Sequence, residues 1–154
     1  MFGYLPQIEI APAPYLNLQN RKTLVIEPWH VLVSMRDGTA FVRAYTEQFI
    51  TTLSKYCNIV YWTDLMPDQI NPLLQKLPTA HHLFQYHCRR VIKKFIQENG
   101  ILIKTLSRLG SDIENTVIID RQEVNFIDDK SMGLELPWRG TKRDTKLLIL
   151  LELL

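Results

Sequence analysis

Apolar positions fall into short runs along the chain, some with the pattern of strands and some with that of helices. Runs of β-branched and aromatic residues predict buried strands at residues 23–26, 58–62, 82–86 and 116–119, with a further short strand at 134–136. Helical spacing predicts helices at 45–56, 67–77 and 141–154, with a helical turn at 106–109. This alternation predicts an α/β fold with a doubly wound, mainly parallel sheet.

Local signals mark turns and helix ends. Asp37-Gly38 predicts a small β-hairpin insertion that joins 31–35 to 40–43, and Asn99-Gly100 predicts another between 91–96 and 101–103. Thr46 is the candidate N-cap of the first helix, and Pro72 should shorten or kink the second. The closing helix holds more leucine than one buried face needs, so core packing and docking on a partner are both open for it.

The chain divides into an arm and one domain. Residues 1–22 contain Pro6, Pro12 and Pro14 among aromatic and aliphatic side chains, which predicts an extended arm that lies against another surface. Residues 23–154 are expected to form a single domain, and a chain of 154 residues is long enough to build a core.

Composition excludes several classes of protein. A formal charge of +2 does not indicate a nucleic-acid binder. Cys57 and Cys88 have no metal-ligand spacing and are interpreted as buried thiols. The longest apolar run, at 147–151, falls far short of the roughly 20 residues that span a membrane. The first four residues do not open a basic presequence or a signal peptide, so composition names no compartment.

Three predicted strands end in polar side chains. Glu27 follows the first strand, Thr63 follows the second, and Asp120 ends the strand at 116–119. The carboxyl ends of parallel strands meet at one edge of a sheet, so we expect these side chains to lie close together. Pro-Trp-His-Val follows Glu27, without a second acid. The position has the form of a catalytic strand end whose chemistry has been removed.

Four motifs occur in the order found in the haloacid dehalogenase superfamily. Residues 27–33, Glu-Pro-Trp-His-Val-Leu-Val, stand where the family has Asp-x-Asp-x-Thr-Leu-Val. Tyr-Trp-Thr at 61–63 matches its second motif, Lys104 its lysine, and Val-Ile-Ile-Asp at 117–120 its last. From about residue 22 onward the chain resembles the branch that contains NLI-interacting-factor domains and the phosphatases of the RNA polymerase carboxy-terminal domain.

Within this branch, the chain is most similar to the presequence-receptor subunits of the mitochondrial inner-membrane translocase. That subgroup has a proline-rich lead-in, an eroded first motif and a Pro-Trp-x-Gly segment before its last helix. This chain has Pro-Ala-Pro-Tyr at 12–15 and Pro-Trp-Arg-Gly at 137–140.

The resemblance also shows what the site lacks. Phosphatases of the family use the first Asp as nucleophile, the second as acid and base, and the first and last acids to hold Mg²⁺. Here Glu27 is one methylene longer than Asp, Trp29 replaces the second acid, and Arg121 follows Asp120. We therefore expect a degenerate, noncatalytic pocket of Glu27, Trp29, Thr63, Lys104, Asp120 and Arg121, in which the charges neutralise one another.

Other residues have weaker claims to a site. His81, His82, His87 and Cys88 do not combine into a zinc site, because adjacent strand residues point to opposite faces. The candidate partner-binding residues are Tyr15, the basic cluster Arg89, Arg90, Lys93 and Lys94, and Trp138. A solvated face is the alternative for the basic cluster.

The resemblance implies a noncatalytic scaffold or protein-binding subunit of a mitochondrial inner-membrane complex. Its partners would be other protein subunits of a large assembly. It would lie peripheral to the membrane without spanning it, and would use no nucleic acid, cofactor or metal. The alternatives are a presequence-receptor-like component of protein import and a residual Mg²⁺-dependent phosphatase with Glu27 as nucleophile. The chain shows no acidic excess, which ranks the general scaffold above the presequence receptor.

Overall fold

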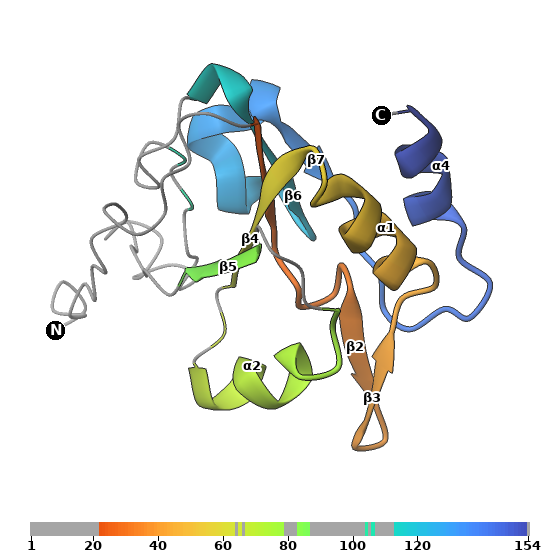
Figure 1. Ribbon diagram of the computed structural model, residues 1–154. Helices are drawn as coiled ribbons and strands as arrows, with labels where there is room; N and C mark the ends of the chain where they lie inside the picture. Colours follow the sequence, from red (N-terminus) through yellow and green to blue (C-terminus); the bar gives the residue numbers. More distant parts are fainter. Residues whose placement is uncertain are drawn as a thin grey trace, which may run out of the picture.

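The computed structural model describes residues 22–63, 65, 67–78, 83–86, 104, 106 and 113–153. Among these residues, five parallel strands form one sheet in the order β5-β4-β1-β6-β7 (Figure 1). The strands are β1 (Lys22–Ile26), β4 (Cys57–Trp62), β5 (Leu83–Tyr86), β6 (Thr116–Asp120) and β7 (Gly133–Glu135). The central strand β1 pairs with β4 and with β6 over most of its length. The predicted mainly parallel sheet is confirmed.

Helices α1 (Thr46–Leu53), α2 (Pro67–Leu74) and α4 (Lys146–Leu153) contribute to the core on one face of the sheet. Strand alternation directs Leu24 and Ile26 of β1 toward this face, where they join Phe49 and Ile50 of α1 and Leu147 of α4 in one buried cluster. Full burial of side chains of this size stabilises the fold by about 1.5–3 kcal/mol each. The helix stripes predicted from the sequence are thus core positions.

The opposite face is covered by the 3₁₀ segment η4 (Glu123–Met132), which packs on β6 and β7, while the 3₁₀ turn η3 (Ile113–Asn115) directly precedes β6. Val25 of β1, Leu106 and Phe126 of η4 belong to a second buried cluster on this side. A Cβ at Gly133 would collide with the Phe126 ring, so glycine is required for η4 to approach β7. The sheet is therefore covered on both faces, as expected for an α/β fold.

The small hairpin insertion is also confirmed. Strands β2 (Val33–Arg36) and β3 (Thr39–Val42) pair antiparallel in a separate two-stranded sheet. Between them Asp37 and Gly38 have φ of 52° and 77°, the left-handed values that a tight two-residue turn requires. The hairpin projects from the carboxyl edge of the main sheet (Figure 1).

Several predicted boundaries need correction. Thr46 is not the N-cap of α1: Tyr45 occupies that position with φ 69°, and the Thr46 hydroxyl donates to the Arg43 carbonyl at 2.7 Å. Helix α2 ends at Leu74 with Pro72 inside it, and α4 begins at Lys146 rather than at 141. The sequence did not predict η4. The hairpin at 91–103 and most of the turn at 106–109 lie outside the described residues.

Arg43 is a buried cation that joins distant parts of the chain. Its Nε and NH2 donate to the two Asp144 carboxylate oxygens, each at 3.1 Å, and its NH1 donates to the carbonyls of Val31 and Leu136 at 3.0 and 3.2 Å. The planar guanidinium suits such a fork, which lysine cannot reproduce. This contact ties the segment before β2 to the linker between β7 and α4.

Replacing Arg43 with methionine should lower the free energy of unfolding by about 3–5 kcal/mol, because the Asp144 carboxylate and two carbonyls lose their donor. Urea denaturation measures the change. The control is Lys130→Met, which removes an exposed ion pair to Glu123 and should change stability by less than about 0.5 kcal/mol. Equal losses in the two variants would contradict the assigned role of Arg43.

The Arg43–Asp144 pair also makes the stability of the domain depend on pH under acidic conditions. Partial burial by itself would raise the Asp144 pKa, but hydrogen bonds from Arg43 and the Lys146 amide, with their charges, lower it below its usual value. A carboxyl with a lowered folded-state pKa stabilises the fold above its unfolded pKa of about 3.9, and this contribution is lost as pH falls toward the folded value. The wild-type chain should therefore lose more stability than Asp144→Asn below about pH 4, as urea denaturation at a series of pH values will show.

Candidate functional site

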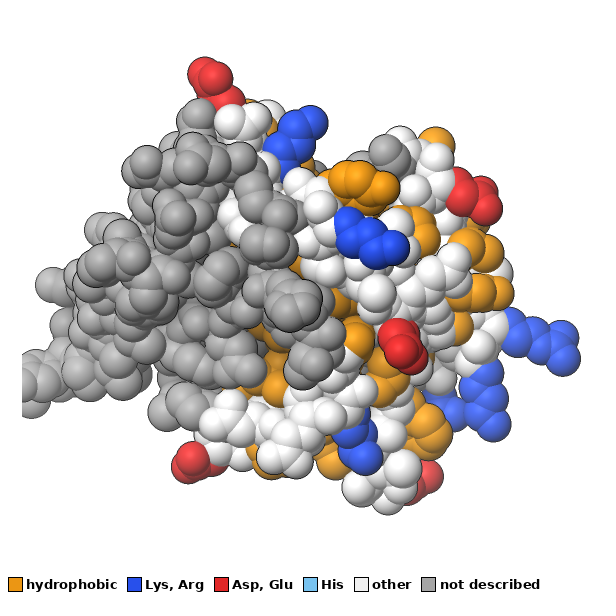
Figure 2. All heavy atoms as spheres, viewed as in Figure 1, with side chains coloured by type: hydrophobic (Ala, Val, Ile, Leu, Met, Phe, Trp, Pro, Cys, Tyr) orange, Lys and Arg blue, Asp and Glu red, His pale blue; other side chains and the backbone are white. Residues whose placement is uncertain are grey.

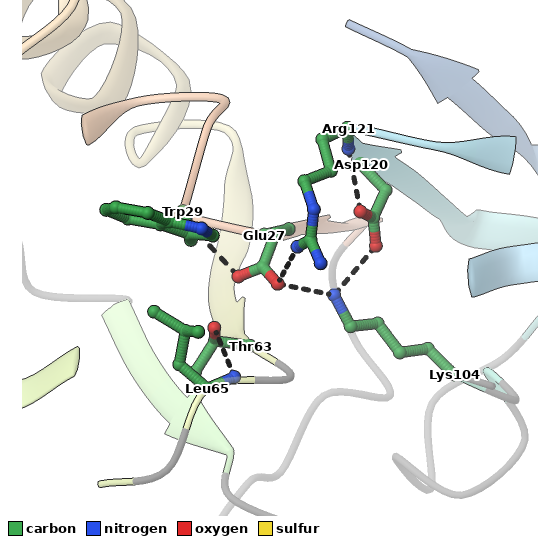
Figure 3. A network of polar contacts seen from close by, with 7 residues as sticks. All are labelled: Glu27, Trp29, Thr63, Leu65, Lys104, Asp120 and Arg121. Atoms are coloured by element: carbon green, nitrogen blue, oxygen red, sulfur yellow. Dashed lines mark hydrogen bonds and ion pairs between the residues drawn. The ribbon is translucent and has the colours of Figure 1, made fainter. Parts of the chain in front are cut away.

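The three polar strand ends meet at the carboxyl edge of the sheet, as the sequence predicted. Glu27 follows β1, Thr63 follows β4, and Asp120 is the last residue of β6 (Figure 3). Glu27 and Asp120 are fully buried, and Thr63 is nearly so. Parallel pairing in register brings these ends together, because Ile26 lies opposite both Tyr61 and Ile119.

Lys104 lies between the two carboxylates. Its Nζ is 2.7 Å from Asp120 Oδ2 and 3.3 Å from Glu27 Oε1, and all three side chains are buried. The Lys104 amide donates to the Asn125 carbonyl of η4 at 2.7 Å, which fixes the backbone from which the ammonium reaches the sheet edge. A charged group that is buried away from water needs such partners, since burying an isolated ion costs several kcal/mol.

Arg121 supplies the second cation. Its NH1 is 3.0 Å from Glu27 Oε1, and its backbone amide donates to Asp120 Oδ1 at 2.7 Å. The side chain is 20% exposed and closes over Glu27 from the direction of β6 (Figure 3). Two carboxylates thus face two cations, and the formal charge of the four side chains is zero.

Trp29 stands where an acid would be needed for proton transfer. Its backbone amide donates to Glu27 Oε2 at 3.3 Å, so both oxygens of that carboxylate are engaged. Its ring stacks on His30 with centroids 4.1 Å apart, and His30 has a left-handed φ of 60°. The indole has no group that titrates near neutral pH.

Thr63 directly follows β4, and its side chain bonds to the backbone of the turn that comes next. Its Oγ1 accepts a hydrogen bond from the Leu65 amide at 3.1 Å, which stabilises the turn after the strand. The hydroxyl lies at the sheet edge, bonded to the turn and not to the charged side chains drawn in Figure 3.

The magnesium ion that phosphatases of the haloacid dehalogenase superfamily use does not fit these residues. Magnesium takes oxygen ligands in a near-octahedral shell and favours carboxylates with excess negative charge. Here the ammonium of Lys104 bridges the two carboxylates that would hold the ion, and Arg121 removes the remaining negative charge. In the described part of the chain, no group of three or more His, Cys, Asp or Glu side chains is arranged to hold a metal ion.

The predicted partner-binding residues are only partly described. Tyr15, Arg89, Arg90, Lys93 and Lys94 lie outside the described residues. Trp138 is 5% exposed, its Nε1 donates to the Thr141 carbonyl at 2.9 Å, and its amide donates to the His30 carbonyl at 2.6 Å. Its ring therefore offers little surface to a partner. Figure 2 shows acidic, basic and hydrophobic side chains interspersed on one face of the described part.

Sequence reasoning missed the structural residues that hold the cluster. The Asn125 carbonyl receives the Lys104 amide, and an Asp129 oxygen receives the Leu106 amide at 3.0 Å. Both residues lie in η4, which has no helical periodicity to reveal it. Arg43 stands at a position where the resembled family has Arg-Pro, and this match could have pointed to its two hydrogen bonds with the Asp144 carboxylate.

A parallel α/β sheet with an inserted hairpin, and with acids after β1 and at the end of β6, defines a haloacid-dehalogenase-like domain. The family described as NLI interacting factor-like phosphatase matches residues 16–154. The chain belongs to this family.

Curated relatives carry two kinds of name. Mitochondrial import inner membrane translocase subunit TIM50 of Candida glabrata is 27% identical over 93% of this chain and 30% of its own length. The protein of the same name from Caenorhabditis elegans is 28% identical over 93% of this chain and 32% of its own. A protein of Dictyostelium discoideum named "Probable C-terminal domain small phosphatase" is 27% identical over 73% of this chain and 36% of its own. The chain spans about a third of the length of these relatives.

No helix among the described residues is long and apolar enough to cross a membrane.

Replacing Lys104 with methionine should lower the free energy of unfolding by about 3–5 kcal/mol, because two buried carboxylates would then share a single side-chain cation. Arg121→Met is the matched control and should cost less, about 1–2 kcal/mol, since water reaches that side chain. Denaturant unfolding of both variants gives the comparison. Adding Asp120→Asn to Lys104→Met should recover part of the loss, and a Lys104→Met variant as stable as wild type would contradict the charge balance.

Proposed function

We propose that this domain is a pseudophosphatase that acts as a noncatalytic scaffold or protein-binding subunit of the mitochondrial protein-import machinery. The observation that carries the proposal is the neutral cluster in which Lys104 and Arg121 engage the Glu27 and Asp120 carboxylates. A site of this kind holds strands and loops together and leaves no carboxylate available for attack.

The proposed loss of activity rests on the catalytic groups that this site lacks for phosphate-ester hydrolysis. An attacking carboxylate needs an unengaged oxygen in line with phosphorus, but both Glu27 oxygens accept hydrogen bonds. The extra methylene of Glu27 also moves its oxygens by more than about an ångström from an aspartate's position, a misplacement that costs about 10²-fold in rate. Protonation of a leaving alkoxide needs an acid at position 29, which is Trp29.

The relatives support the cellular setting. By resemblance to the TIM50 relatives, the chain is associated with the mitochondrial inner membrane. Translocase subunits work beside other subunits, so the partners proposed here are the proteins of such an assembly. The buried state of Trp138 leaves the arm and the basic cluster of Arg89, Arg90, Lys93 and Lys94 as the candidate contacts.

A residual phosphatase is the second candidate, because carboxylates remain at the ends of β1 and β6 and the Dictyostelium relative is named a phosphatase. A receptor for presequences is a narrower form of the first proposal. Presequences are basic, and the interspersed charges on the face shown in Figure 2 form no acidic patch that would select them.

The test is native purification of the full chain from mitochondria, with a phosphatase assay on the same material. We expect stoichiometric recovery of inner-membrane translocase subunits. We also expect that, in magnesium buffer, the wild-type chain hydrolyses p-nitrophenyl phosphate no faster than an Asp120→Asn control does. Recovery of the chain without partners would overturn the scaffold. Magnesium-dependent turnover that Asp120→Asn abolishes would establish the phosphatase instead.

A receptor role is separated from a general scaffold by adding a fluorescent basic amphipathic peptide to the purified chain. Saturable binding that a scrambled peptide of equal charge does not show would support the receptor. Equal binding of both peptides would leave the general scaffold as the function.

A further inference from the structure

The closing helix α4 carries apolar side chains on its outward side as well as on the side that faces the core. Leu147 points into the core and is fully buried. Ile149 is 52% exposed and Leu153 is 78% exposed. These two residues are four positions apart, so their side chains are neighbours on the helix surface, on the side away from Leu147. The extra leucine and isoleucine of this helix are therefore not all used by the core.

The apolar surface continues from α4 onto its neighbours. Figure 1 shows that α4 lies beside α1 at the edge of the molecule, and the two helices contact each other. A groove of about 430 Å³ beside the helix is lined by Leu150 and Leu151 of α4 together with Tyr56 and Val117. Tyr56 is 73% exposed and Val117 is 47% exposed. Exposed apolar side chains that gather in one place mark an interaction surface more often than scattered ones do.

Charged residues stand at both ends of the exposed stripe. Lys146 precedes Ile149 by three positions and Glu152 follows it by three, and both charged side chains are exposed. All three lie on the same side of the helix. When two copies of α4 run antiparallel with their Ile149 side chains opposed, Lys146 of each copy faces Glu152 of the other. The stripe is thus complementary to a second copy of itself, as a twofold interface requires.

The same charges select one arrangement of the two helices. A parallel pair in register would put Lys146 against Lys146 and Glu152 against Glu152, and facing like charges disfavour it. The antiparallel pair also sets the positive end of each helix dipole beside the negative end of the other. Charge and apolar contact therefore favour the same geometry.

We propose that the outward stripe of α4, formed by Lys146, Ile149, Glu152 and Leu153, is the contact through which two copies of this chain form a symmetric antiparallel dimer. A contact centred on one two-turn helix from each copy belongs to the small class of interfaces, below about 1,200 Å² in total. We therefore expect a dimer that dissociates on dilution. This assignment does not depend on whether the domain is catalytic or on which assembly it joins.

Sedimentation equilibrium of the full chain over a range of concentrations measures the dimer. Lys146→Glu and Glu152→Lys should each weaken dimerisation about tenfold, because each change sets like charges opposite each other twice in a symmetric pair. A chain that carries both changes should dimerise as the parent does. The matched control is Lys76→Glu, which makes the same change of charge at an exposed position after α2 and should also dimerise as the parent does.

An equimolar mixture of the Lys146→Glu chain and the Glu152→Lys chain gives the sharpest readout. In the mixed pair each facing contact is again between opposite charges, so the mixture should dimerise more strongly than either variant alone. A change in the folding of one variant could not produce this recovery. A mixture that associates no better than its components would contradict the antiparallel register.

Disulfide trapping tests the position of the twofold axis. In chains that carry Cys57→Ser and Cys88→Ser, Ile149→Cys should give a disulfide-linked dimer under mild oxidation, because the axis passes between the two residues at position 149. The control is Ile127→Cys on η4, where the isoleucine is 42% exposed, and it should give far less linked dimer.

Three results would overturn the proposal. The first is a wild-type chain that stays monomeric at every concentration. The second is a dimer that Lys146→Glu and Glu152→Lys weaken no more than Lys76→Glu does. The third is a chain that is monomeric by itself but loses its co-purifying subunits on Ile149→Asp, which would assign the stripe of α4 to another protein.

Discussion

Two carboxylates are buried at the carboxyl edge of the sheet, and the fold accommodates them because two cations face them. Lys104 bridges Glu27 and Asp120, and Arg121 completes the charge balance. Burying one such group alone would cost several kcal/mol, so each partner constrains the others. The ends of β1 and β6 and the backbone near η4 are thereby held at one point. In this structure all four charged side chains make ion pairs with one another.

The surrounding loops are anchored in the same manner. The Trp138 backbone amide donates to the His30 carbonyl in the loop after β1. The Arg43 guanidinium donates to the Val31 carbonyl in the same loop and to the Leu136 carbonyl after β7. These contacts connect the exit of β1 to the linker that leads into α4. A catalytic site usually keeps part of its edge mobile for substrate entry. In the described part of this edge, buried hydrogen bonds hold the loops, which is consistent with the noncatalytic role proposed above.

The sequence was sufficient for the parts of the fold that depend on apolar periodicity and turn chemistry. The strands around Glu27, Thr63 and Asp120 and the Asp37-Gly38 hairpin were predicted because burial and left-handed turns leave clear local patterns. The segment η4 was missed because its residues pack by 3₁₀ turns without helical spacing. The burial of Trp138 could not be predicted from local sequence either, since its backbone amide is held by the carbonyl of His30, more than a hundred residues earlier.

The sequence pointed to the residues of the site but not to the individual contacts between them. The motifs contain Glu27, Lys104 and Asp120, and Arg121 follows the last of them. Only the three-dimensional arrangement shows that Lys104 touches both acids and that Trp29 binds Glu27 through its backbone. The most direct test of the central claim is a calorimetric titration of the full chain with magnesium chloride, alongside Asp120→Asn. The account predicts no saturable heat in either protein at millimolar magnesium. Saturable binding by the wild-type chain that Asp120→Asn abolishes would contradict it.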